Sequence, residues 1–363
     1  MIQKLQLELT TKCNLSCEYC LKPPLVSELD KNAVEKLSGV AKKFVLYGYG
    51  EPLLHEKILH FVKALEGEIV VSTNGMVDEN FYEVAELVDV FGISLDVNNA
   101  LRHGMELSKI FRKLENLKGE AIAQIVLTQD NLPNFPELAQ ILAERGLDIM
   151  ATNLIAPNSE IYSKALYFEG SRANADFLHV DEDFVLKILK ARKSEPEELK
   201  MSSKVNFCAL LEAKDRVQRA KKSEEIIEKV EELAKSYGVD FVKPKFFGEA
   251  DQRDCPYKDS LFVRADAKIS PCMPFAYTHN EFVNRRSIVI REHILGNLSE
   301  EIDKIVEIKS KFEKLRKEMD FPWCGDCGHV AGCWFLENGM DCYANKPSCS
   351  NCLYSAGIAK CLI

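Results

Sequence analysis

Three cysteines near the start of the chain, Cys13, Cys17 and Cys20, constrain what this sequence can fold into more than any other feature. They follow the pattern CxxxCxxC, so one short loop offers three thiolates to a metal. A structural zinc site closes with four ligands, and an iron–sulfur cluster in a simple electron carrier also takes four cysteines. Three ligands on one loop therefore indicate a [4Fe–4S] cluster with one iron left open to something other than protein. The alternative interpretation is an incomplete zinc knuckle or a chance grouping.

The position of this loop indicates an α/β fold. Residues 2–9 alternate apolar and polar side chains as a strand does, and the cysteines follow soon after them. Strands are also predicted at 43–48, 68–73, 90–95, 121–127 and 148–154, and helices at about 31–41, 56–66, 79–88, 105–118 and 135–145. Six such units predict parallel strands joined by right-handed crossovers. The cysteines would then lie at the C-terminal end of the first strand, where α/β barrels carry their chemistry.

The cysteine loop, with Tyr19 between its last two cysteines, resembles the signature of the radical S-adenosylmethionine (SAM) enzymes. That resemblance implies a partial (β/α)6, TIM-like barrel over about the first half of the chain. It also implies that the open iron binds the amine and carboxylate of SAM, and that reduction then yields a 5′-deoxyadenosyl radical. Tyr19 would lie beside the adenine.

Several strand ends also match the family. Residues 47–54 resemble its Gly-Gly-Glu segment, with Tyr49 in place of the first glycine, and residues 72–75 resemble its Thr-Asn-Gly. The Gly-x-Ile-x-Gly pattern often seen near adenine is absent from residues 124–128. The resemblance implies SAM contacts by Tyr19, Gly48, Gly50, Glu51, Asn74, Ser94, Asp96 and Asn153. Turn chemistry and strand-end capping are the alternative explanation of these residues.

The C-terminal part is rich in cysteine, with Cys255, Cys272, Cys324, Cys327, Cys333, Cys342, Cys349, Cys352 and Cys361 all lying after residue 254. Its Cys-x2-Cys pairs fit either structural zinc or iron–sulfur clusters. The run Cys324-x2-Cys327-x5-Cys333 resembles the centre of the SPASM domain, although Glu337 stands where that family has a further cysteine. A hairpin predicted before Cys272 has alanine at position 267, where the family has glycine, and alanine is strained at positive φ.

By this resemblance the tail holds two auxiliary [4Fe–4S] clusters. One ligand set would be Cys255, Cys272 and Cys342, and the other Cys324, Cys327, Cys333 and Cys352, with Cys349 and Cys361 as further possible ligands. Cys208 fits a buried hydrophobic position better than a ligand. The predicted domains are a radical SAM core at 1–180, a charged helical connection at 181–247 and the SPASM-like domain at 248–363. A helix is predicted at 223–237, and a strand at 239–243.

Bulk composition excludes some functions and leaves others open. Hydrophobic residues make up 46% of the 363-residue chain, so a sizeable core is available, and the net charge is −9. No basic stripe stands out, which disfavours nucleic acid as a partner. Neither a signal peptide nor an apolar run long enough to span a bilayer is apparent. The cysteines are therefore interpreted as metal ligands in a reducing cytoplasm.

The tail favours a particular role within the family. Residues 270–275, 333–334, 341–343 and 347–352 resemble the maturases associated with tungsten-dependent aldehyde ferredoxin oxidoreductases. That resemblance implies a protein, peptide or pterin-cofactor substrate, and an electron donor such as ferredoxin or flavodoxin. One alternative is a peptide- or protein-modifying maturase that oxidises side chains or forms thioether or carbon crosslinks. A second alternative is a non-catalytic iron–sulfur electron carrier or scaffold.

Overall fold

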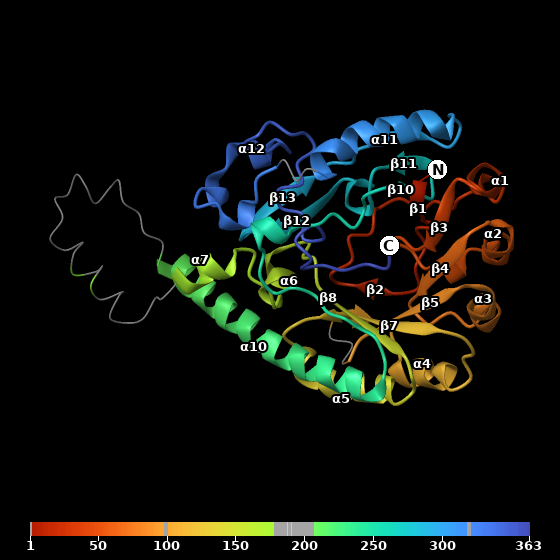
Figure 1. Cartoon of the computed structure of the whole chain (residues 1–363), viewed down its shortest axis with the longest axis horizontal. Coiled ribbons are helices and arrows are strands. Elements are labelled where there is room, and N and C mark those ends of the chain that lie inside the picture. Colours follow the sequence, from red (N-terminus) through yellow and green to blue (C-terminus); the bar gives the residue numbers. More distant parts are fainter. Residues whose placement is uncertain (1, 98–100, 178–186, 188–189, 191–206, 318–320) are drawn as a thin grey trace.

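A computed structural model describes residues 2–97, 101–177, 187, 190, 207–317 and 321–363 (Figure 1). The six predicted strands are present as a run of parallel neighbours: β1 (Ile2–Leu7), β3 (Ala41–Leu46), β4 (Glu68–Thr73), β5 (Val90–Leu95), β7 (Ala121–Leu127) and β8 (Asp148–Asn153). The helices between them are also confirmed: α1 (Ala33–Leu37), α2 (Ile58–Ala64), α3 (Phe81–Leu87), α4 (Leu107–Leu114) and α5 (Phe135–Ala143). The predicted barrel architecture is therefore correct for the first half of the chain.

The sheet continues beyond the barrel strands in both directions. Its order is β14-β11-β10-β1-β3-β4-β5-β7-β8-β9. The added strands are β9 (Phe241–Val242), β10 (Ser260–Val263), β11 (Lys268–Ser270) and β14 (Gly296–Asn297). β10 pairs in parallel with β1, and β9 pairs in parallel with β8. Strands from all three predicted segments thus share one sheet, and the cysteine-rich part is built directly onto the barrel edge.

Alternation along β1 shows how this sheet buries two faces. Leu5 and Leu7 are fully buried in the main apolar core, which also holds the inward side chains of the helices. Gln6 and Glu8 alternate with them and are buried on the opposite face, the interior of the barrel. Burying each such leucine contributes roughly 1.5–3 kcal/mol. Gln6 and, just after β1, Glu8 therefore face the barrel interior, whereas Leu5 and Leu7 pack against the helices.

A long helix, α10 (Phe207–Tyr237), connects the two halves and packs against α5. It contains the predicted helix at 223–237 and begins earlier; the side chain of Cys208 lies outside the described residues. It ends before Gly238, whose φ of 73° suits glycine best. Its buried Arg216 lies 3.3 Å from a Glu169 oxygen and stacks on the ring of Tyr162. This ion pair fixes α10 against the segment that follows the last barrel strand.

The cysteine-rich half consists of short elements and long loops. It contains the hairpin β12 (His279–Val283) and β13 (Arg286–Ile290), the helix α11 (Ile302–Lys317) and the short helix α12 (Trp334–Glu337). The turn between β10 and β11 places Ala267 at a φ of 66°, the conformation that favours glycine. The C-terminal residues return into the barrel, where Figure 1 marks that end of the chain.

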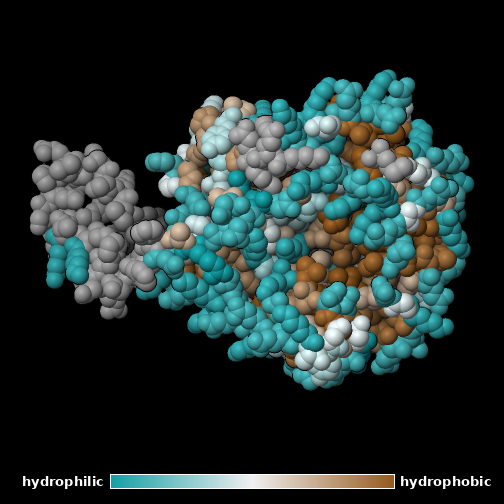
Figure 2. All heavy atoms as spheres, viewed as in Figure 1, coloured by the Kyte–Doolittle hydropathy of each residue, from teal (hydrophilic) through white to brown (hydrophobic). Residues whose placement is uncertain are grey.

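Hydrophobic and hydrophilic side chains occupy different parts of the surface. On the face shown in Figure 2, hydrophobic residues gather over the barrel part, and hydrophilic residues surround them. Among the described residues, no helix has the length and apolar character that a membrane crossing requires.

Candidate active site

The C-terminal ends of the barrel strands enclose a cavity of about 210 Å³, which we call the barrel cavity. It collects nearly all of the residues predicted to bind SAM or the SAM-binding cluster: Cys13, Cys17, Tyr19, Cys20, Gly48, Gly50, Glu51, Asn74, Ser94 and Asn153. Asp96 does not line it. Its buried carboxylate instead accepts a hydrogen bond from Asn131 Nδ2 at 3.0 Å. Asp96 therefore supports the loop after β7, and its charge contributes to raising the pKa of Cys17 and of Tyr19.

Two contacts hold the cysteine loop over this cavity. A short strand within it, β2 (Ser16–Cys17), pairs with β6 (Arg102–His103), so that Cys17 lies opposite Arg102. Asn74 Nδ2 donates to Asn14 Oδ1 at 2.7 Å and approaches Cys13 Sγ at 3.7 Å. The Asn74 side chain thus contacts the cysteine loop itself. Asn74 directly follows β4, and β6 lies in the loop after β5, so segments at the C-terminal ends of the barrel strands determine where the three thiols lie.

Cys13 and Cys17 are partly buried and Cys20 is exposed, and neighbouring protein atoms disfavour the thiolates of Cys17 and Cys20. Burial raises the pKa of Cys17, although the nearby Arg102 charge works in the opposite direction. Burial also raises the pKa of Cys20, to about 11. Metal binding therefore has to displace protons from these thiols. Among the described residues, no three His, Cys, Asp or Glu side chains converge closely enough to hold a single metal ion.

Glu51 is the buried acid of the cavity. Its carboxylate accepts hydrogen bonds from Thr73 Oγ1 at 2.7 Å, from the Asn74 backbone N–H at 2.7 Å and from the Leu53 N–H at 3.0 Å. Burial raises its pKa, and these hydrogen bonds oppose that rise. The segment lies close to the cysteine loop, because a Cβ on Gly50 would stand only 2.0 Å from the Thr10 carbonyl oxygen. Glycine is thus required here for contact with the protein's own loop.

Two residues that line the barrel cavity each carry a buried polar atom with no hydrogen-bond partner among the described residues. Arg102 is 5% exposed and its Nε is unpartnered, and Asn153 is 2% exposed with an unpartnered Oδ1. The Asn153 amide nitrogen is used, since it donates to the carbonyls of Lys245 and Ile358. A buried donor and a buried acceptor left unsatisfied are costly, which fits a cavity built for a ligand. Sequence reasoning missed Arg102, whose only local signal is an arginine shortly after a strand.

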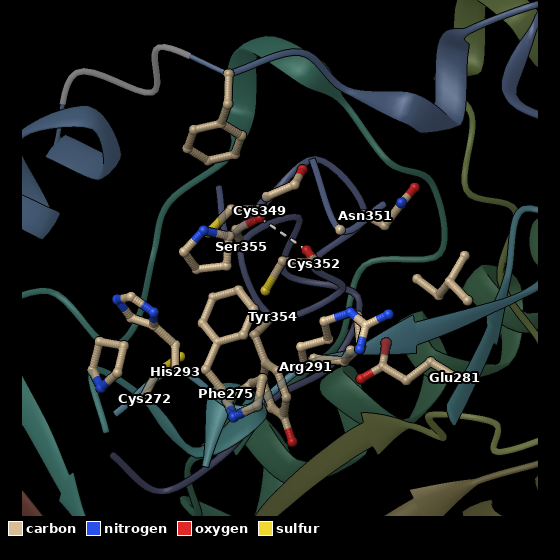
Figure 3. Close-up of a pocket in the computed structure, with 18 of the residues that line it drawn as sticks. Cys272, Phe275, Glu281, Arg291, His293, Cys349, Asn351, Cys352, Tyr354 and Ser355 are labelled. Atoms are coloured by element: carbon tan, nitrogen blue, oxygen red, sulfur yellow. Dashed lines mark hydrogen bonds between the residues drawn. The ribbon is translucent and has the colours of Figure 1, made fainter. Parts of the chain in front are cut away.

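A second cavity, of about 390 Å³, lies in the cysteine-rich half, and we call it the auxiliary cavity. It is lined by Cys255, Cys272, Cys349 and Cys352 (three of them labelled in Figure 3). Burial raises the pKa of Cys272 to about 12 and that of Cys352 above its usual range, and neighbouring thiols add to both shifts. Ile155 and Tyr354 line this cavity and the barrel cavity alike. The two cavities are therefore adjacent.

A third group of thiols lies near α12. Burial raises the pKa of Cys324 to about 12, and the thiols of Cys327, Cys333 and Cys342 contribute to the rise. The Asp341 carboxylate accepts hydrogen bonds from the Tyr343 and Asn345 backbones and shapes the turn that carries Cys342.

These groups differ from the predicted ligand sets. Cys342 lies with Cys324, and Cys352 lies with Cys272, whereas the sequence suggested the reverse. The reason is the folding of the tail: the turn at Asp341 keeps Cys342 near α12, and a tight turn joins Cys349 to Cys352, whose N–H donates to the Cys349 carbonyl at 3.1 Å. Cys361 belongs to an aromatic cluster, and its sulfur lies 3.6 Å from the Tyr257 hydroxyl.

Comparison with known proteins agrees with this architecture. The SPASM model, described as an iron–sulfur cluster-binding domain, matches residues 255–329. The solved structure of anSMEcpe with bound AdoMet is similar over 97% of this chain and 93% of its own, with a TM-score of 0.53 and 16% identity. Streptococcus suis SuiB is similar over 95% of this chain and 74% of its own, with a TM-score of 0.54 and 12% identity.

The SPASM match and the fold shared with these solved structures agree with the resemblance of the cysteine loop to the radical SAM signature. Among named relatives, the "tungsten-containing aldehyde ferredoxin oxidoreductase cofactor-modifying protein" of Pyrococcus furiosus is 25% identical over 99% of this chain and 97% of its own length. The mycofactocin maturase MftC of Mycolicibacterium smegmatis is 26% identical over 40% of this chain and 43% of its own.

Proposed function

We propose that the barrel cavity binds SAM beside a four-iron cluster held by Cys13, Cys17 and Cys20. We further propose that the protein matures a tungstopterin-dependent aldehyde ferredoxin oxidoreductase or its cofactor. The observation that carries the first proposal is that Cys13, Cys17, Cys20, Glu51 and Arg102 all line one cavity, and that the buried Arg102 Nε has no hydrogen-bond partner among the described residues. The second is supported by the Pyrococcus relative, whose similarity spans nearly the whole chain.

Each polar group of the cavity has a complementary part of SAM. Glu51 and the neighbouring backbone would hold the ammonium group, and the Arg102 guanidinium would pair with the carboxylate. The free Oδ1 of Asn153 would accept a hydrogen bond from a donor on the ligand. When bound, the cluster and SAM supply abstraction of a hydrogen atom from an unactivated carbon. The chain itself binds and orients the reactants and excludes water.

The two cysteine groups of the tail are proposed to hold auxiliary [4Fe–4S] clusters. One set is Cys255, Cys272, Cys349 and Cys352, and the other is Cys324, Cys327, Cys333 and Cys342. Each set supplies the four thiolates that a [4Fe–4S] cluster takes. Because Ile155 and Tyr354 line both cavities, the first set lies beside the reaction site. A ferredoxin or flavodoxin is the proposed external electron donor.

SAM binding is tested with the anaerobically reconstituted protein, by measuring SAM affinity and its reductive cleavage to 5′-deoxyadenosine. Replacing Arg102 with methionine removes the buried cation and should weaken SAM binding at least tenfold, because hydrogen bonds to charged groups contribute roughly 1.5–3 kcal/mol. Arg112→Met, on the exposed surface of α4, is the matched control. Failure of the wild type to cleave SAM would refute the enzymatic proposal.

The substrate is tested by producing a tungsten aldehyde ferredoxin oxidoreductase together with either the wild-type protein or Cys17→Ala. We expect active oxidoreductase only with the wild type, because Cys17→Ala removes a ligand of the SAM-binding cluster. Equal oxidoreductase activity in both cases would contradict the tungsten role. Mass spectrometry of candidate peptides incubated with the reconstituted protein would then test the peptide-maturase alternative.

A further inference from the structure

We propose that Lys309 raises the reduction potential of the iron–sulfur centre assigned to Cys255, Cys272, Cys349 and Cys352. The inference rests on the proposed function, because it takes these four thiols as the ligands of an auxiliary [4Fe–4S] cluster. It concerns a residue of α11 to which the cysteine pattern does not point. Lys309 lines the auxiliary cavity together with the four cysteines.

Two hydrogen bonds hold the Lys309 ammonium against the segments that carry two of these thiols. Its Nζ donates to the Pro271 carbonyl at 2.8 Å, and Pro271 directly precedes Cys272. The same nitrogen donates at 3.1 Å to the carbonyl of Tyr257, which lies shortly after Cys255 in the chain. The ammonium therefore joins the Cys255 segment to the Cys272 segment and lies beside both.

The Lys309 ammonium is a buried charge. The side chain of Lys309 is 4% exposed, and its Nζ lies 2.9 Å from Oε1 of Glu313, whose side chain is 6% exposed. Lys309 lines the auxiliary cavity, whereas Glu313 is not among its described lining residues. The positive end of this buried pair is thus the end nearer to the thiols. In agreement, burial raises the pKa of Cys272, and the charge of Lys309 is the largest effect that opposes the rise.

Other charged side chains also line the auxiliary cavity, but they differ from Lys309 in exposure or pairing. Arg291 and Lys346 are exposed, so water and salt screen their charges. The buried acid Glu281 lies 3.0 Å from His279 Nε2. Among the described residues of this lining, Lys309 is therefore the one buried lysine or arginine.

A buried cation beside an iron–sulfur centre acts on the potential of that centre through its charge. Reduction adds one negative charge to the centre, and the attraction between that charge and the Lys309 ammonium is strong where the dielectric is low. Lys309 thus stabilises the reduced form more than the oxidised form and raises the potential. The Glu313 carboxylate repels the added charge and works in the opposite direction.

The test is a redox titration of the reconstituted full-length protein, following the electron paramagnetic resonance signal that Cys272→Ser perturbs. Lys309→Met should make its midpoint potential more negative by at least about 59 mV, a tenfold change in the equilibrium constant of a one-electron couple. Glu313→Gln removes the acid, keeps the ammonium and should shift the potential in the positive direction. Lys311→Met, at an exposed position on the same helix, is the matched control and should leave the potential unchanged.

Opposite shifts in the two variants distinguish an effect of charge from a loss of structure, which would not change sign between them. The proposal is overturned if Lys309→Met and Glu313→Gln leave the potential unchanged or shift it in the same direction. Should Lys309→Met fail to assemble the centre, the direction of the Glu313→Gln shift decides the matter.

Iron content and SAM cleavage, measured on the same samples, separate this inference from the proposed function. About twelve irons per chain with unchanged potentials in the variants would overturn the role of Lys309 and leave the proposed clusters standing. A wild type that cleaves SAM but holds only about four irons would refute the auxiliary clusters, and the role of Lys309 with them.

Discussion

Single buried polar residues determine much of the geometry around the candidate active site. Glu51 joins the ends of β3 and β4 by accepting from Thr73 and Asn74, and Asn74 in turn contacts the cysteine loop. Each of these contacts leaves a buried group unsatisfied if one partner is removed, at a cost of about 1–3 kcal/mol. The position of the thiols therefore depends on residues that would not themselves bind metal.

A single residue, His279 on β12, makes the stability of the fold depend on pH. Its Nε2 lies 3.0 Å from Glu281 Oε1, and its Nδ1 lies 2.8 Å from the Tyr277 carbonyl oxygen. Burial disfavours the charged imidazolium, but the hydrogen bond and charge of Glu281 outweigh it and raise the pKa of His279 above 6.5. Because the pKa of His279 is raised in the folded state, its charged pair with Glu281 stabilises the fold fully below pH 6.5. That stabilisation is lost as the pH rises through the raised pKa.

We therefore expect the free energy of unfolding of the wild type, relative to His279→Asn, to fall as the pH rises from 6.5 upward. Urea unfolding of both proteins across a pH series measures that difference. A difference that does not change with pH would contradict the proposed charge on His279. Glu281→Gln should remove most of the dependence, because it removes the partner that holds the proton.

At the scale of elements, the contact between β5 and the C-terminal segment can be tested directly. A Cβ on Gly92 would stand 2.7 Å from Leu362 Cδ1 and 3.1 Å from Gln124 Nε2. Gly92→Ala should therefore overpack the barrel and destabilise the protein by roughly 1–3 kcal/mol. Combining it with Leu362→Ala should recover part of that loss, which thermal or urea unfolding of the four proteins in the cycle would measure. Additive effects would show that the segment does not lie against β5.

Helices and strands could be predicted from the sequence where their signal lies in neighbouring residues. The alternation in β1 and the repeated strand-then-helix units predicted the barrel, and the CxxxCxxC spacing located the loop. Pairing of β10 with β1, and of Cys17 with Arg102, joins residues far apart in the sequence and leaves no local pattern. The assignment of Cys342 and Cys352 to clusters stays a prediction, and it differs from the grouping of the thiols in the structure because that grouping depends on how two turns fold.

At the scale of the whole molecule, Glu8 joins the barrel to the cysteine-rich half. Its carboxylate accepts hydrogen bonds from the Tyr277 hydroxyl, from the Tyr49 N–H at 2.9 Å and from the Ala265 N–H at 3.3 Å. Tyr277→Phe removes one donor from this buried acid and keeps the ring, which stacks 3.9 Å from the Arg264 guanidinium. We expect a loss of about 1–3 kcal/mol in urea unfolding. Tyr82→Phe, at a position 40% exposed, is the control and should be neutral.

The number of clusters, and the cysteines that hold each one, can be tested on the whole chain. Three [4Fe–4S] centres would give about twelve irons per chain, falling to about eight when Cys13, Cys17 and Cys20 are replaced by alanine. The grouping of the thiols predicts that Cys342→Ser perturbs the same auxiliary centre as Cys324→Ser, and that Cys352→Ser perturbs the same centre as Cys272→Ser. Iron content with electron paramagnetic resonance of each reduced variant distinguishes the centres. A Cys342→Ser spectrum that matches Cys272→Ser would instead support the ligand sets expected from the sequence, and iron near four in the wild type would mean that the tail holds no clusters.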